Sequence, residues 1–264
     1  MKSRTICFAA VVSLLFTAEF KVLLAADADG PLVLTATTVA LDGKARNEFA
    51  AKEPIWVRFS LENTGDSKVT VWLYGMGEYG VQIEAAKDSK SKVRTIERLE
   101  LPDIMFIPKT FEPKEKMTFD VLLVDFIDFT GEGAVNLQAT LGLDAELHPV
   151  HQVRTAFSFT LKGQLDKKGL DALLKSVEAL YGSDSMADRY RAVDSARAIR
   201  VPEVLPMLAK AIVDKDEILQ YHAVQSLSVL PYPEVIPILK KALESTHPAV
   251  RGAANYELGR REKH

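Results

Sequence analysis

The segment Tyr190-Arg191-Ala192-Val193-Asp194-Ser195 returns at an offset of thirty-one residues as Tyr221-His222-Ala223-Val224-Gln225-Ser226. The segment Pro202-Glu203-Val204-Leu205-Pro206-Met207-Leu208 returns at the same offset as Pro233-Glu234-Val235-Ile236-Pro237-Ile238-Leu239. A fixed period of this size is typical of stacked helical pairs, in which each pair buries its apolar face against its neighbours. The C-terminal part of the chain is therefore expected to be a short α-solenoid.

The hydrophobic pattern around this repeat predicts six helices in three pairs. Apolar residues from Leu170 to Tyr181 follow a period of about 3.6 residues, which predicts the first helix. Ser185, with Asp188 three residues later, resembles a cap that opens a second helix over about 186–199. Pro202 suits the first turn of a third helix. The other three helices are expected over about 216–229, 233–244 and 248–260.

These repeats resemble the short HEAT-like repeats found in phycobilisome lyases and in many bacterial envelope proteins. The resemblance rests on the Pro-Glu-x-x-Pro-x-Leu starts at Pro202 and Pro233, and on small-residue helices around Arg191-Ala192-Val193 and Arg251-Gly252-Ala253-Ala254. It implies a HEAT-like repeat domain over residues 164–264 and a surface for a protein partner. It implies no activity, and a lyase is disfavoured because those enzymes use longer arrays.

Residues 29–163 show the period of two that is typical of β-strands. Ile55, Val57, Phe59 and Leu61 alternate with Trp56 and other residues, and similar runs end at Leu123, Leu141 and Leu161. Seven to nine strands without a helical period favour a two-sheet sandwich. The segment resembles the immunoglobulin-like β-sandwiches of exported bacterial proteins, although the Cys…Trp…Cys signature of antibody domains is absent. That resemblance implies a fold and no particular function.

The first 28 residues have the pattern of a secretory signal peptide. Lys2 and Arg4 precede an apolar run from Ile6 to Phe16, and small residues follow near Ala28. The alternative, an uncleaved anchor, requires about 20 apolar residues, and charged residues interrupt this run. We therefore expect a periplasmic or secreted protein without a membrane span after cleavage.

Composition excludes several classes of function. The net charge of −3 argues against a nucleic-acid partner. The single cysteine, Cys7, lies inside the signal, so the mature chain is expected to have no disulfide, thiol nucleophile or thiolate metal site.

Three motifs suggest chemistry but have simpler interpretations. His148 and His151, with Asp144 or Glu146 nearby, could hold a metal, but the pattern fixes no third ligand in place, so histidines of an exposed loop are the simpler interpretation. Asp125 and Asp128 are better explained as acids at a strand edge than as a catalytic or calcium-binding pair. The Gly-x-Gly-x-x-Gly string at 75–80 joins two strands and opens no helix, so it does not indicate a dinucleotide site. We expect no catalytic residue, cofactor or metal.

The sequence favours an exported, non-catalytic protein that binds an unidentified protein partner through its repeats. Candidate contact residues lie at non-apolar or changing positions of the second helix in a pair, and they are Arg191, Arg197, His222 and Gln225. The alternative is an accessory module whose sandwich binds a glycan or peptide, for which Trp72 and Tyr74 form an aromatic cluster. An exposed cluster of Trp and Tyr rings would favour the glycan, and an apolar or charged stripe along one face of the repeats would favour the protein partner.

Overall fold

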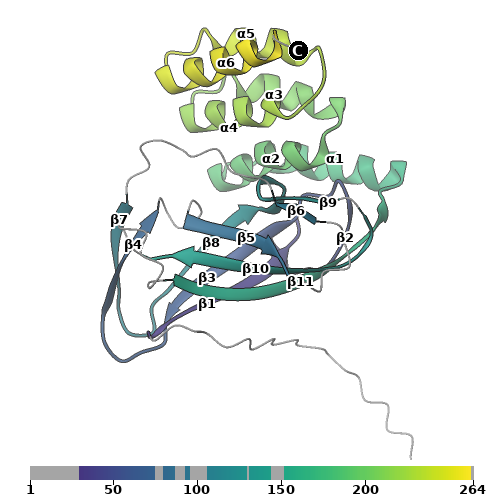
Figure 1. Cartoon of the computed structure of the whole chain (residues 1–264). Helices are drawn as coiled ribbons and strands as arrows, with labels where there is room; N and C mark the ends of the chain where they lie inside the picture. The colour runs from purple at the N-terminus through teal and green to yellow at the C-terminus, as the bar shows by residue number, and fades with distance from the viewer. Residues whose placement is uncertain are drawn as a thin grey trace, which may run out of the picture.

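The chain combines an N-terminal β-rich region with a C-terminal helical region (Figure 1). The computed structural model describes residues 30–74, 80–86, 93–95, 106–129, 131–143 and 152–262. Three helical pairs are stacked in layers on one side of the strands (Figure 1). The expected signal peptide, the pair His148 and His151, and most of the Gly-rich string lie outside the described residues.

Two sheets enclose the core of the β-rich region. The first has the strand order β1 (Leu32–Val39), β3 (Trp56–Asn63), β8 (Lys116–Leu122), and the second has the order β2 (Glu48–Ala51), β11 (Gln152–Gln164), β10 (Gly133–Gly142), β5 (Val81–Ala85). Neighbouring strands are antiparallel except β2 and β11, which are parallel. Two smaller pairs join β4 (Val69–Tyr74) to β7 (Phe106–Phe111) and β6 (Val93–Thr95) to β9 (Ile127–Phe129).

The alternation seen in the sequence explains the core. Val135, Leu137, Ala139 and Leu141 point inward from β10 and are buried, while Gln138 between them is exposed. Residues of both sheets form one apolar cluster. After β8 the chain makes a single 3-10 turn, η2 (Leu123–Asp125), so the expected strand ends one residue earlier than Leu123.

The helices agree closely with the expected positions. They are α1 (Lys167–Tyr181), α2 (Met186–Ile199), α3 (Leu205–Ala211), α4 (Glu217–Ser228), α5 (Val235–Ala242) and α6 (Pro248–Arg261), with a 3-10 turn η3 (Pro202–Val204) before α3. The Ser185 side chain accepts the backbone N–H of Asp188, as the cap pattern predicts. Pro206 lies in the first turn of α3, where its missing N–H breaks no helical hydrogen bond.

The repeat also determines the turn inside each helical pair. Ser183, Asp214 and Ser245 occupy the same repeat position, and each side chain accepts the backbone N–H two residues later, at 3.1, 3.0 and 3.1 Å. Such local side-chain bonds favour turns over continued helix. The chain therefore enters the second helix of each pair in the same way. The second helices α2, α4 and α6 pack one against the next in a row.

Candidate interaction surfaces of the helical repeats

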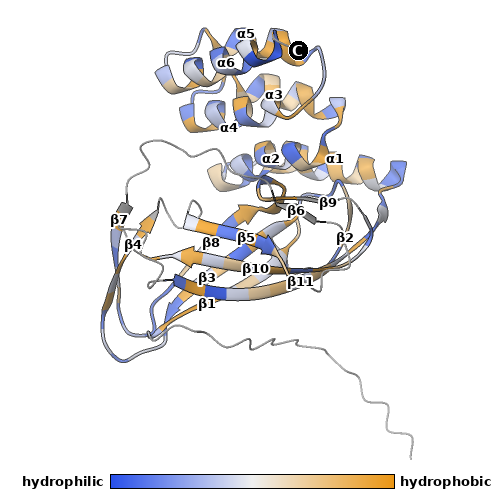
Figure 2. Cartoon of the chain, in the orientation of Figure 1, coloured by the Kyte–Doolittle hydropathy of each residue, from blue (hydrophilic) through white to orange (hydrophobic). Residues whose placement is uncertain are grey.

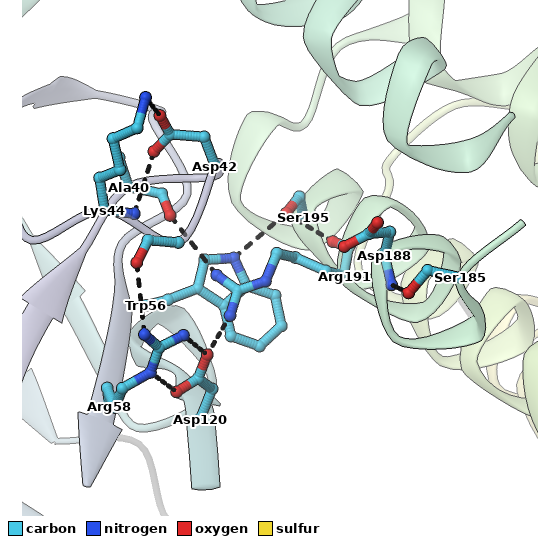
Figure 3. Close-up of polar contacts among 11 residues, drawn as sticks. Ala40, Asp42, Lys44, Trp56, Arg58, Asp120, Ser185, Asp188, Arg191 and Ser195 are labelled. Carbon is cyan, nitrogen blue, oxygen red and sulfur yellow. Dashed lines mark hydrogen bonds and ion pairs between the residues drawn. The ribbon is translucent and has the colours of Figure 1, made fainter. Parts of the chain in front are cut away.

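The first surface of the repeats is the side of α2 that meets the β-rich region. Arg191 of α2 forms an ion pair with Asp120 of β8, and its guanidinium lies 4.5 Å from the centre of the Trp56 ring (Figure 3). Arg58 holds the same carboxylate with two bonds of 2.9 Å. One carboxylate thus serves two guanidiniums, a geometry that arginine provides better than lysine.

Burial and charge act in opposite directions on the pKa of the two arginines at the junction, which is our name for the contact between α2 and the β-rich region. Burial lowers the pKa of Arg191, although Asp120 favours its charged form. For Arg58, the hydrogen bond to Asp120 raises the pKa further above its usual value, against a smaller effect of burial. Arg191 is therefore a desolvated cation that depends on Asp120 and on the Trp56 ring.

Trp56 connects the two regions through both its ring and its N–H group. The Nε1 atom donates to the Ser195 hydroxyl at 3.3 Å, and that hydroxyl donates to the Arg191 carbonyl at 2.7 Å (Figure 3). The ring is buried with Val39 and Leu122. Leu41, from the loop after β1, joins the apolar core of the helices. Side chains of the β-rich region thus complete the packing of the first helical pair.

The same repeat position makes an equivalent contact one layer further along. His222, which corresponds to Arg191, bonds Asp194 of the preceding helix α2 at 2.8 Å. Ser226, which corresponds to Ser195, donates to the Val193 carbonyl of α2 at 2.8 Å. The β-rich region therefore takes the place, against α2, that α2 takes against α4. It caps the N-terminal end of the stack.

A second set of charges extends this junction into the repeats. Arg197 pairs with Asp125 at 3.2 Å and with Asp194 at 2.9 Å. Asp194 is buried, also contacts His222, and so links the β-rich region to α4 through two side chains. The ring of His222 stacks on that of Tyr190 at 5.3 Å.

The four candidate contact residues therefore have different surroundings. Arg191 and Arg197 contact the β-rich region, and His222 contacts Asp194. Gln225 is half-buried on α4. Partner binding by these residues stays a prediction, but three of them already have partners within the chain.

Sequence reasoning did not identify Trp56 or Asp120 as partners of the repeats. The sequence contained part of the information, because Trp56 is a large aromatic residue on the outer face of a strand whose inner face is fully apolar. A strand that buries both faces must be covered on both sides.

The second surface lies at the opposite end of the stack. It consists of the sides of α5 and α6 that face away from α3 and α4. We call it the terminal face and define it by Ile236, Lys240, Leu243, Arg251, Gly252, Asn255 and Tyr256. Figure 2 shows hydrophobic stretches on α5 as well as on the helices beneath it.

Repeat equivalence shows how unusual the exposure of this face is. Leu205 and Ile212 of the second pair are 7% and 2% exposed, whereas their equivalents Ile236 and Leu243 are 38% and 37% exposed. Both pairs have a pair beneath them, and among the helices that the structure describes only the second pair has another above it. Tyr256 corresponds to Asp194, which faces the next helix, and it is 65% exposed. The terminal face is thus an uncovered stacking surface.

The structure adds two facts about other kinds of site. Among the residues it describes, no three metal-ligating side chains gather into a group that could hold an ion. Within the same ranges, every helix is too short or too polar to cross a bilayer.

Comparison with solved structures gives only low overall similarity. A β-glucosidase from Listeria innocua is 12% identical with a TM-score of 0.26, and the match covers 52% of this chain and 17% of that one. Native α2-macroglobulin from Escherichia coli, from domain MG7 to the C-terminus, is 11% identical with a TM-score of 0.28, covering 89% of this chain and 42% of that one. The chain thus spans less than half the length of either structure. These scores carry no argument about fold or function.

Comparison with protein families concerns the helical region. No curated protein matches the chain. Residues 153–259 match the family model of HEAT repeats, which agrees with the 31-residue period and with the three stacked pairs. The C-terminal region is therefore made of HEAT-like repeats.

Proposed function

We propose that this chain is an exported, non-catalytic interaction or scaffold protein of the bacterial periplasm or envelope. In this proposal the HEAT-like repeats bind a protein partner, and an immunoglobulin-like sandwich caps them at one end. HEAT repeats support such a role because stacked repeats present extended binding surfaces. Export rests on residues 1–28, whose pattern is that of a signal peptide.

The exposure of apolar side chains on the terminal face is the observation that carries the proposal. Repeat arrays normally end in a pair whose outer side is polar, which keeps the protein soluble. Here Ile236, Leu243 and Tyr256 stand at stacking positions and are exposed. Exposed apolar residues that lie together mark sites of protein interaction more often than isolated ones do.

A pair of matched variants tests this function. Leu243→Glu with Tyr256→Glu places two charges on the terminal face, and Val213→Glu with Ile218→Glu places two charges at exposed apolar residues elsewhere on the repeats. Both variants should keep the wild-type melting temperature within a few degrees, as expected for exposed sites. The chain is then used to capture proteins from an envelope extract of the native cells.

The expected result is a protein captured by the wild type and by the Val213 and Ile218 variant, and lost with the terminal-face variant. Equal capture by all three chains would contradict the proposed binding surface. The mass of the chain recovered from the envelope also reports whether residues 1–28 have been removed.

An accessory module that binds a glycan is the second candidate function. Trp72 of β4 is 43% exposed opposite Pro108 of β7, beside the hydroxyl pair of Thr70 and Thr110, whose oxygens are 2.8 Å apart. A sugar stacks on such a ring with hydroxyls nearby. The other tryptophan, Trp56, is buried, so a change in fluorescence on adding oligosaccharides should vanish in Trp72→Ala. A change that persists in Trp72→Ala would not support this function.

A further inference from the structure

The terminal face continues an interface that the chain already uses twice. In that interface the second helix of each pair reaches the turn inside the next pair. Arg189 of α2 pairs with Asp214 in the turn before α4, and Gln220 of α4 accepts the Ser245 hydroxyl at 2.6 Å in the turn before α6. Arg189 and Gln220 occupy the same repeat position.

Arg251 is the third residue at that position, on α6. It repeats the contact that Gln220 makes within its own pair, because its guanidinium donates to the Ser245 carbonyl at 2.7 Å as Gln220 donates to the Asp214 carbonyl at 2.5 Å. The contact to a following turn, which Arg189 and Gln220 both make, has no counterpart for Arg251 in the part of the chain that the structure describes.

The charges and shape of the face indicate what it fits. The two side chains of the face that are charged at neutral pH, Lys240 and Arg251, are both basic. A Cβ atom built on Gly252 has nothing within 4 Å, and Gly252 stands at the repeat position where the earlier pairs carry Tyr190 and Tyr221. Apolar Ile236 lies on the neighbouring helix α5, and Leu243 is the residue that caps the C-terminal end of α5. A basic group beside exposed apolar side chains matches an amphipathic helix that carries an acid at its start.

A second copy of this chain fits the terminal face poorly. Face-to-face contact would bring Lys240 and Arg251 toward the same cations of the other copy, and like charges disfavour such contacts. Head-to-tail contact would require the opposite end of the stack, where the β-rich region already covers α2 through Arg191 and Trp56.

We infer that the terminal face receives an acidic helical pair of another protein, stacked as α3 and α4 are stacked on α1 and α2. A carboxylate in the turn of that pair faces Arg251 as Asp214 faces Arg189. The inference rests on the proposed function and deepens it, because it names the kind of partner.

The probe is a synthetic peptide of residues 202–230, which contains the turn with Asp214 and both helices of the second pair. Since short helices are marginally stable in isolation, the same segment is also fused after His264 through a flexible Gly/Ser linker, which raises its local concentration. The protein is the full chain with Cys7→Ser, so that an introduced cysteine is its single thiol. Leu243→Cys reports on the terminal face, and Val213→Cys is the control.

The tethered segment should slow maleimide labelling of Leu243→Cys and leave Val213→Cys unchanged. Arg251→Glu should weaken binding of the free peptide about tenfold or more, since hydrogen bonds between charged groups are the strongest polar contacts. Asp214→Arg in the peptide should restore part of the binding to the Arg251→Glu chain.

The outcomes separate this inference from the proposed function. Protection of Leu243→Cys, together with peptide binding that neither Arg251→Glu nor Asp214→Arg changes, would overturn the acidic partner and leave the apolar surface in place. No protection with the tethered segment would overturn helical stacking on this face, whereas the capture experiment above would still decide whether the repeats bind a protein.

Discussion

The two ends of the repeat stack differ in what covers them. At the N-terminal end, the outward position of the second helix carries Arg191, which is held by Asp120 and Trp56. At the C-terminal end, the outward position carries Tyr256, which is exposed. Within one chain, the repeat thus meets a permanent polar partner on one side and presents an uncovered apolar surface on the other.

This difference indicates which end binds within the chain and which is open to other molecules. The covered end combines ion pairs, a cation–π contact and buried Leu41, so its partner is specified by several directional contacts at once. The open end has apolar side chains and two cations, which fit a partner that associates and dissociates. The difference is open to measurement by substituting equivalent positions.

The largest expected effect separates Ile212 from its repeat equivalent Leu243. Ile212→Ala removes a fully covered side chain and should lower the free energy of unfolding by about 2–5 kcal/mol. Leu243→Ala removes a side chain that is already partly in water, so it should cost less than about 1 kcal/mol. Denaturant unfolding of the two variants measures both values. Equal losses would show that the terminal face is covered in solution.

A smaller effect is expected at the covered end. Arg191→Ala leaves Asp120 with Arg58 alone and removes the cation from the Trp56 ring, which should cost about 1–3 kcal/mol. His222→Ala, at the equivalent position, breaks one bond to Asp194 and should cost about 0.5–1.5 kcal/mol. A double-mutant cycle of Arg191 and Asp120 measures their coupling directly. A smaller loss for Arg191→Ala than for His222→Ala would mean that the junction contributes little stability.

Much of the helical region could be predicted from the sequence, because its contacts are local and repeated. The Ser185 cap, the start of α2 at Met186 and the place of Pro206 follow from residues close to one another in the chain. In the β-rich region the long strands were visible for the same reason. The parallel pairing of β2 with β11 was not, since pairing between distant strands leaves no local pattern.

The junction shows why candidate contact residues are harder to interpret. A polar residue at a changing repeat position, such as Arg191, indicates contact with something other than the repeat core. Its partner Asp120 is 71 residues away in the sequence, and no local pattern connects the two. Sequence alone therefore identifies a contact position without deciding whether the contact lies within the chain or with another protein. The exposed face at Tyr256 required comparison of burial between repeats.

The smallest expected effect concerns how stability depends on pH through the ion pair of Arg189 with Asp214. This is the contact between successive pairs that the terminal face lacks. Burial favours a higher pKa for Asp214, but the backbone N–H of Asp216 and the guanidinium of Arg189 outweigh it and hold the pKa below the ordinary 3.8. A carboxyl whose pKa is lowered by folding stabilises the protein above its unfolded pKa, and this contribution is lost as the pH falls through the lower folded-state value.

Asp214→Asn should therefore cost about 0.5–1.5 kcal/mol near neutral pH, the size of a partly exposed charged pair. The difference from the wild type should shrink as the pH is lowered below 3.8, where the wild-type carboxyl also loses its charge. Melting temperatures of both chains across this range measure it. Because Arg251 has no described carboxylate in a following turn, Arg251→Gln should cost less than Asp214→Asn and show no acid dependence. An acid-dependent loss in Arg251→Gln would reveal a carboxylate already paired with Arg251, and the two ends of the stack would then be more alike than the structure indicates.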